Sequence, residues 1–357
     1  MPMHSIKIIH KLINKIIWQT QNLFLGCTGR INGLFHRYQE TQNILICGSG
    51  RSGTTWLAEL FSNIIDNATL VNEPLHINNS KKLMKIGFDW NQHIPESCQS
   101  WQAANLFFNH LFSGQELNPN YFYYNKKTSV IRIPFTKYWI HKFVRIHLLL
   151  PWIVNHYQVR KPIYLIRHPF AVIASQLKSN DWDPTLNRFP FPKVRYSQVF
   201  EPYRSIMKKV KTNEPYLAVE WCLTNKYLLT HRFHNQKWLT VAYEHLLQNP
   251  KDELRRISNG LGIAFTKGLP GEQIFAPSGS TKENSLIREG FSPSKVDQQL
   301  TDWQGFLSPH QKALIHEILL DFDISVYHKD KIEPEDSLFA LNNTSDKNTG
   351  NAFKNKL

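Results

Sequence analysis

A short apolar run that leads into a glycine-rich loop and then into a helical pattern constrains the fold of this chain most. The run "NILIC", residues 43–47, has the composition of a buried strand, and the loop "GSGRSG" follows it. After the loop, Leu57, Leu60, Phe61 and Ile64 recur at helical spacing. A buried strand followed by a helix is typical of a parallel sheet that is covered on both faces. In such sheets, ligands bind beyond the carboxyl ends of the strands.

Further segments repeat or extend this pattern. We expect a β-branched strand at 128–134, and a strand at 162–166 followed by a helix that begins near Pro169. A third unit combines a strand at 238–242 with a helix at 251–261. Strands that alternate with helices predict the α/β class. The expected architecture is a three-layer sandwich, in which helices flank a central parallel sheet.

The chain of 357 residues divides into three expected segments. Residues 43–332 form the main domain, and the polar residues 333–357 are expected to be a disordered tail. Residues 1–42 form a basic amphipathic helical segment, in which apolar positions share one face and Lys7, Lys11 and Lys15 are spaced four apart. Such a helix can lie on an anionic membrane or pack on the protein's own core. It has neither the unbroken apolar stretch of a signal peptide nor that of a membrane span.

The net charge of +14 indicates an anionic partner. Most of this surplus belongs to residues 43–332, which carry +11. The four cysteines show neither the spacing of a zinc site nor that of a disulfide framework. We therefore expect reduced thiols and a cytoplasmic protein, at most peripheral to a membrane.

The glycine-rich loop has the residues to hold a phosphate group. Its glycines allow the backbone to approach the anion closely, and the following helix supplies unpaired N–H groups. Arg51 adds a planar guanidinium, and three hydroxyl side chains add donors. Thr54 stands where a nucleotide hydrolase has lysine. The candidate binding residues are Gly50, Arg51, Ser52, Gly53, Thr54 and Thr55.

A second phosphate site is expected where the strand at 162–166 ends. Arg167 follows this strand, and Ser175 lies eight residues later, about two turns into the expected helix. One guanidinium and one hydroxyl can thus meet a second anion.

The two motifs together resemble the sulfotransferase family that uses 3′-phosphoadenosine-5′-phosphosulfate (PAPS). "GSGRSGTTWL" is similar to the family's 5′-phosphosulfate loop, and "LIRHPFAVIASQL" is similar to its 3′-phosphate motif. The resemblance extends over about 43–327, including the tryptophan-led "DWQGFLSPHQKALIHEILLDFDI", taken as one C-terminal helix. It implies the P-loop version of the three-layer sandwich, PAPS as co-substrate and no metal. It also implies that Trp56 stacks on adenine, with core packing as the alternative for Trp56. His168 replaces a frequent Asp without touching the phosphate contact.

The acceptor hydroxyl needs a base, and the segment "LVNEPLH" offers two candidates. The resemblance to the carbohydrate-directed branch favours Glu73 as the base, and His76 is the second candidate because histidine titrates in the useful range. Arg51 is expected to stabilise charge on the leaving phosphate oxygen. Arg132 could act near the sulfonate or form a structural ion pair. In the C-terminal part, Lys282 and Arg288 are candidate phosphate contacts.

The arginine-type loop and the Glu-Pro element favour a glycan or glycolipid as acceptor. Aromatic residues could line its cleft or pack in the core, among them Trp101, Phe107, Phe108 and 121–124. Two alternatives remain: a P-loop nucleotide kinase or phosphotransferase, and a non-catalytic protein that binds anions or membranes. Nucleic acid is not an expected partner, because no groove-reading or stacking motif occurs.

Overall fold

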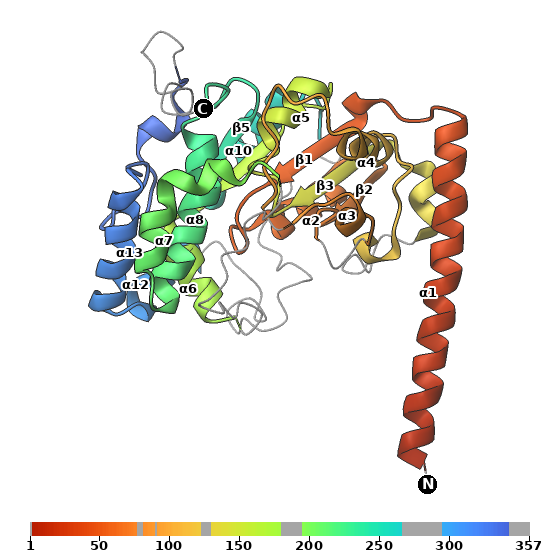
Figure 1. Ribbon diagram of the computed structural model, residues 1–357, viewed down its shortest axis with the longest axis horizontal. Helices are drawn as coiled ribbons and strands as arrows, with labels where there is room; N and C mark the ends of the chain where they lie inside the picture. Colours follow the sequence, from red (N-terminus) through yellow and green to blue (C-terminus); the bar gives the residue numbers. More distant parts are fainter. Residues whose placement is uncertain are drawn as a thin grey trace.

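The structure, a computed structural model, describes residues 2–76, 81–89, 91–122, 130–179, 195–265 and 295–342. Its centre is a sheet of five parallel strands in the order β2-β3-β1-β4-β5 (Figure 1). The strands are β1 Asn43–Cys47, β2 Ala68–Asn72, β3 Tyr138–Phe143, β4 Ile163–Ile166 and β5 Leu239–Ala242. The prediction of an α/β fold with a central parallel sheet between helices is confirmed.

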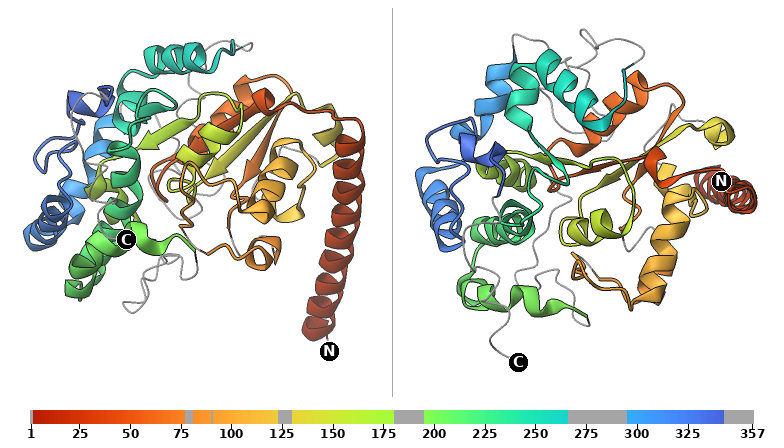
Figure 2. Two further views of the ribbon diagram at one scale, coloured as in Figure 1. Left: turned by 45° about the horizontal axis from the view of Figure 1, so that its top comes forward. Right: turned by 90° about the horizontal axis from the view of Figure 1, so that it is seen from above.

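Helices cover both faces of the sheet (Figure 2). Because side chains alternate along a strand, Ile44 and Ile46 of β1 pack with α2, α9 and α10, whereas Leu45 and Cys47 pack with α4, α5, α6 and α8. The α-helices are α1 Pro2–Leu34, α2 Thr54–Ile64, α3 Lys81–Lys85, α4 Gln102–Phe112, α5 Leu150–His156, α6 Pro169–Leu177, α7 Arg204–Lys209, α8 Asn213–Leu229, α9 Tyr243–Gln248, α10 Pro250–Leu261, α12 Val296–Phe306 and α13 Pro309–Asp321.

The strand expected at 128–134 is wrong. Residues Val130–Phe135 form a 3-10 helix, and the strand β3 follows it at Tyr138–Phe143. Pro134 lacks the N–H that a central strand would need for its ladder, so pairing begins only beyond it. Arg132 therefore lies in the 3-10 helix before β3.

Two expectations for the C-terminal part also change. The tryptophan-led helix is in fact two helices, α12 and α13, because Ser308 caps a new helix whose first turn contains Pro309. Residues 333–342, which were expected to begin a disordered tail, pack against the domain. Leu338 is buried, and its carbonyl accepts hydrogen bonds from His234 and Asn235 at 2.8 and 3.0 Å.

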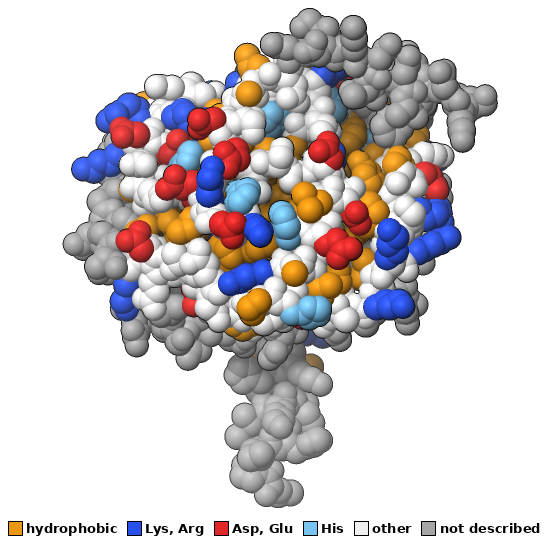
Figure 3. All heavy atoms as spheres, turned by 90° about the vertical axis from the view of Figure 1, so that its left-hand side faces the viewer, with side chains coloured by type: hydrophobic (Ala, Val, Ile, Leu, Met, Phe, Trp, Pro, Cys, Tyr) orange, Lys and Arg blue, Asp and Glu red, His pale blue; other side chains and the backbone are white. Residues whose placement is uncertain are grey.

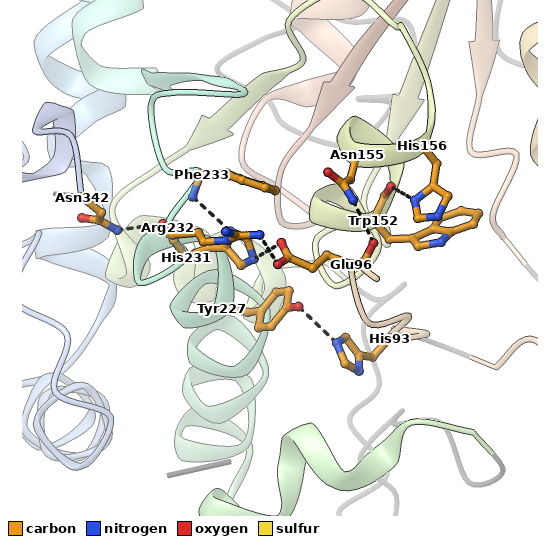
Figure 4. A network of polar contacts seen from close by, with 10 residues as sticks. All are labelled: His93, Glu96, Trp152, Asn155, His156, Tyr227, His231, Arg232, Phe233 and Asn342. Atoms are coloured by element: carbon orange, nitrogen blue, oxygen red, sulfur yellow. Dashed lines mark hydrogen bonds and ion pairs between the residues drawn. The ribbon is translucent and has the colours of Figure 1, made fainter. Parts of the chain in front are cut away.

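A polar network ties the segment before α4 to α5 and to the end of α8 (Figure 4). Glu96 pairs with Arg232, and its Oε2 lies 3.5 Å from His231 Nε2. The carbonyl of Glu96 accepts a hydrogen bond from Asn155 at 3.2 Å. The ring of His93 contacts the Tyr227 hydroxyl at 3.1 Å. These bonds cross long stretches of sequence, so they fix the loop around residues 91–100 against the helical layer.

Other short elements are 3-10 helices at Glu40–Gln42, Pro119–Phe122, Ser197–Tyr203 and Asp336–Phe339.

The face formed by α12 and α13 carries acidic and basic side chains side by side (Figure 3). The drawn side chains on this face therefore do not create a field of a single sign.

We expect the free energy of unfolding to fall as pH drops from about 6.5 to 4. Burial lowers the pKa of His93, His147, His168 and His231 to about 4, and that of His141 to about 3. These histidines stay neutral in the folded chain but take up protons once unfolded, so acid favours unfolding. Glu220, whose pKa burial raises to about 7, offsets one of these groups.

Urea unfolding at a series of pH values would measure this slope. His147 is a suitable test residue, because neither of its ring nitrogens has a hydrogen-bond partner in the part of the chain that the structure describes. His147→Phe should therefore flatten the slope. A slope unchanged by this substitution would contradict the assignment of His147 as a neutral buried group.

Candidate active site

The glycine-rich loop between β1 and α2 is tightly packed. A Cβ on Gly48 would lie 2.3 Å from the Leu165 carbonyl oxygen, and one on Gly53 would lie 2.7 Å from the Tyr243 ring. Gly53 also has a φ of 96°, which favours glycine. The close packing leaves room only for glycine at both positions, so the loop runs directly past the end of β4 into the first turn of α2.

Short polar contacts fix the shape of this loop. The backbone N–H and the hydroxyl of Ser52 both donate to the Ser49 carbonyl, at 3.0 and 2.6 Å. The amide of Asn225 in α8 donates to the Ser49 hydroxyl at 2.8 Å and accepts the Tyr164 hydroxyl at 2.7 Å. Ser52 and Thr54 are buried. The loop is therefore held from the helical layer as well as from the sheet.

The two motifs that the sequence assigns to phosphate binding meet in space. Arg51 Nε donates to Ser175 Oγ at 3.0 Å, and Arg167 Nη1 donates to the Arg51 carbonyl at 3.2 Å. Gln176 Nε2 donates to the Gly50 carbonyl at 3.3 Å. They meet because β1 and β4 are neighbours, so the elements after them leave the sheet at the same edge.

Arg167 lies against an aromatic ring. Its guanidinium carbon is 4.5 Å from the centroid of the Tyr243 ring. Its Nε is buried and lacks a hydrogen-bond partner within the described ranges, which leaves a donor for an anion. Trp56 contacts the same Tyr243 ring edge to face at 6.0 Å and is only partly buried. This position is compatible with both interpretations of Trp56, core packing and stacking on a base.

His168 acts structurally in the turn between β4 and α6. Its Nδ1 accepts the N–H of Phe170, which caps the helix as an aspartate would, and its ring stacks on Trp303 at 4.7 Å. The N–H of His168 donates to the buried Glu244 carboxylate at 2.9 Å, and this carboxylate also accepts the Tyr327 hydroxyl at 2.9 Å. The turn that carries Arg167 is thus fixed by buried hydrogen bonds.

Glu73, after β2, lies in a buried cluster of charges. Its Oε1 is 2.7 Å from Lys142 Nζ, and its Oε2 accepts the Val144 N–H at 3.2 Å and lies 3.7 Å from Arg145 Nη1. Burial alone would raise the pKa of Glu73, but Lys142 and Arg145 outweigh it and lower the pKa below its usual value. Glu73 therefore carries its negative charge throughout the neutral range.

His76 is tied to this cluster through its backbone, because its N–H donates to the Glu73 carbonyl at 3.0 Å. Burial and then the charge of Arg145 lower the pKa of His76 to about 4, although Glu73 acts in the opposite direction. His76 is therefore neutral near pH 7. Since β3 lies between β2 and β1, Lys142 at the end of β3 stands between Glu73 and the glycine-rich loop.

A scan against protein-family models matches residues 43–267 to the sulfotransferase family. The chain belongs to the sulfotransferase family. Its activity is accordingly sulfuryl transfer, and the phosphotransferase and non-catalytic alternatives are set aside. The matched region contains every residue of the glycine-rich loop, of the Arg167 turn and of the Glu73 cluster.

Solved structures similar to this sulfotransferase include the sulfotransferase domain from the curacin biosynthetic pathway, at a TM-score of 0.40 and 14% identity, covering 79% of this chain and 97% of that one. A mouse sulfotransferase complexed with PAP is similar at a TM-score of 0.41 and 14% identity, and the match covers 81% of this chain and 87% of that one. Retinol dehydratase in complex with androsterone and PAP is similar at a TM-score of 0.41 and 16% identity, and the match covers 81% of this chain and 83% of that one. A search of curated proteins found no match.

The sequence reasoning missed residues that the structure places in the candidate site of this sulfotransferase. Lys142 and Arg145 were not singled out, because β3 was expected at the wrong position. A lysine within the otherwise apolar and aromatic run "YWIHKF" was the available signal. Asn225 inside α8 and Glu244 at the start of α9 gave weaker signals. They become recognisable only through the buried partners that the fold brings to them.

Other predicted residues are accounted for differently. Lys282 and Arg288 lie outside the described residues, and so does the side chain of Arg132. The aromatic residues named as candidate cleft residues are instead core residues where they are described: Trp101, Phe107, Phe108, Tyr121 and Phe122 are all buried. Within the described ranges, no group of three or more His, Cys, Asp or Glu side chains is arranged to hold a metal.

Glu244→Ala should lower the stability of the sulfotransferase by about 2–6 kcal/mol, because two buried donors lose their acceptor and each such loss costs about 1–3 kcal/mol. A thermal melt would measure the change. The control is Asp302→Ala, which removes the partly exposed ion pair with Lys178 and should cost at most about 1 kcal/mol. Equal shifts for the two variants would contradict the structural role of Glu244.

Proposed function

We propose that this sulfotransferase moves the sulfuryl group from PAPS to a hydroxyl of a glycan or glycolipid. The observation that carries the proposal is the junction of Arg51, Ser175 and Arg167, which gathers two guanidinium groups and one hydroxyl at one edge of the sheet. A donor with phosphate groups at both ends needs two cationic sites. The buried Nε of Arg167, which has no partner in the described residues, fits such an anion.

The roles follow from the positions of the side chains. The loop residues Gly50, Arg51, Ser52, Gly53, Thr54 and Thr55 would bind the 5′-phosphosulfate at the start of α2, and Trp56 would stack on the adenine. Arg167 and Ser175 would bind the 3′-phosphate. Arg51 would also neutralise the charge that grows on the leaving phosphate oxygen.

Glu73 would accept the proton of the acceptor hydroxyl as its oxygen bonds to sulfur and the bond from sulfur to the phosphate oxygen breaks. Lys142 contacts Glu73 directly and lies on the side of Glu73 that faces the glycine-rich loop. It would therefore stabilise the negative charge on the sulfuryl group during its transfer. Glu73 is favoured over His76 because Lys142, Arg145 and the Val144 N–H hold its carboxylate in place.

The glycan or glycolipid acceptor rests on the arginine in the glycine-rich loop and on the Glu-Pro element at Glu73. The same proposal places the enzyme in the cytoplasm, in peripheral contact with a membrane, where a glycolipid would be accessible. Cys27, Cys47, Cys98 and Cys222 are free thiols, which agrees with a reducing compartment. Transfer of labelled sulfate from PAPS to glycan, lipid and phenol acceptors would test the acceptor class, and transfer to phenols alone would overturn it.

Arg167→Ala should weaken binding of adenosine 3′,5′-bisphosphate by roughly ten- to a hundredfold, because it removes a charged donor from the second phosphate site. Isothermal titration calorimetry would measure the affinity. Arg160→Ala is the matched control: Arg160 precedes β4 at the opposite edge of the sheet, where it donates to the Leu261 carbonyl at 2.6 Å. If both variants bind equally well, the second phosphate site is wrong.

Glu73→Gln should lower kcat by about 10²–10⁴-fold while leaving the affinity for adenosine 3′,5′-bisphosphate unchanged, because the amide cannot accept the proton. Glu116→Gln is the control, since Glu116 is also buried and paired with a lysine, Lys82, outside the site. Turnover lost in His76→Phe but retained in Glu73→Gln would assign the base to His76 instead.

A further inference from the structure

Among the described side chains of the long helix α1, the buried ones lie in its C-terminal half. Leu25 and Asn32 are buried against the domain, and Asn32 Nδ2 donates to the Gly114 carbonyl at 2.7 Å. Gly29 packs so closely on Gln115 that an added Cβ would lie 2.4 Å from its carbonyl oxygen. The N-terminal half extends past the rest of the molecule, as Figures 1 and 2 show. At 1.5 Å per residue, the whole helix is about 50 Å long.

The apolar stripe of α1 does not face the domain. The contacting residues, Leu25 to Asn32, recur on one side of the helix, whereas a row of exposed apolar side chains points away from it by about 130° at 100° per residue. The members of this outward stripe are 39–76% exposed: Ile13, Ile16, Ile17, Leu23, Phe24, Ile31 and Leu34. The alternative that this apolar face packs on the protein's own core is therefore wrong.

The charges of α1 are all of one sign. Residues 1–39 contain no acidic residue. Lys7, Lys11 and Lys15 belong to the N-terminal half of the helix, which extends past the domain. A second copy of the helix would bring like charges together, whereas an anionic surface attracts them. The stripe is also wider than the two positions in seven that form a coiled-coil seam.

We propose that α1 lies flat on an anionic lipid bilayer, with the outward stripe inserted at the boundary between headgroups and acyl chains. No helix among the described residues is long and apolar enough to cross a membrane, so the contact is along the surface. At 100° per residue, the register positions of the three lysines fall on the side of the helix opposite the stripe. A helix is only about 10 Å across, so positive charge at these positions is within about one Debye length of the lipid headgroups.

Flotation of the full chain with vesicles tests this inference. Vesicles of phosphatidylcholine mixed with phosphatidylglycerol should bind the protein, and vesicles of phosphatidylcholine alone should bind it more weakly. The variant I13S/I16S/I17S should lose binding to both. K7Q/K11Q/K15Q should lose roughly a hundredfold in partition onto the anionic vesicles only, because each lysine near the surface contributes about a factor of five.

The control variant L106S/L320S removes exposed leucines of α4 and α13 and should bind vesicles normally. The affinity for adenosine 3′,5′-bisphosphate, measured on each variant, shows that the domain is folded and tests the donor proposal separately, since membrane contact does not depend on it. Unchanged flotation of I13S/I16S/I17S would overturn the inference. So would light scattering that shows a dimer of the wild-type chain dissociated by these substitutions without any vesicle binding.

Discussion

The hydrogen bond from Arg51 to Ser175, with the one from Arg167 to the Arg51 carbonyl, joins two motifs that lie more than a hundred residues apart. This junction depends on the pairing of β1 with β4, which brings both strand ends to one edge. It also depends on glycine at positions 48 and 53, because any side chain there would meet β4 or the Tyr243 ring. The central sheet therefore determines the site more directly than the loop sequence does. The helices pack on both faces of the sheet. From this helical layer, Asn225 hydrogen-bonds to the glycine-rich loop and Glu244 hydrogen-bonds to the turn that carries Arg167.

The glycine-rich loop, the Arg167 turn and the strands β1, β4 and β5 could be predicted because each signal is local. A buried strand, a glycine and the first turn of a helix are adjacent in sequence, so they can be recognised without knowledge of the tertiary fold. The strand β3 was misplaced because "SVIRIP" has the β-branched composition of a strand, while Pro134 and the following residues decide where pairing begins. Lys142 and Arg145 were lost with that strand.

The orientation of α1 shows a different limit of sequence reasoning. Periodicity identifies an apolar stripe but does not say toward which body the stripe is turned. The short residues Thr28, Gly29 and Asn32 allow the helix to approach residues 114 and 115 closely, and this places the larger apolar side chains outside. A face made of small and polar residues would not be chosen as the packed face from hydrophobicity alone.

The cluster around Glu73 reconciles its lowered pKa with the proposed role of Glu73 as the base. In the structure, Lys142 and Arg145 hold the carboxylate ionised, so it is ready to accept a proton but binds one weakly. A sulfonate bound toward the loop would share the charge of Lys142, which stands between the loop and Glu73. When Lys142 interacts with the sulfonate, it stabilises the Glu73 carboxylate less, and the pKa of Glu73 rises. The negative charge of the bound donor also raises this pKa. The proton affinity of the base would thus increase only when the donor is in place, which couples proton removal to sulfuryl transfer.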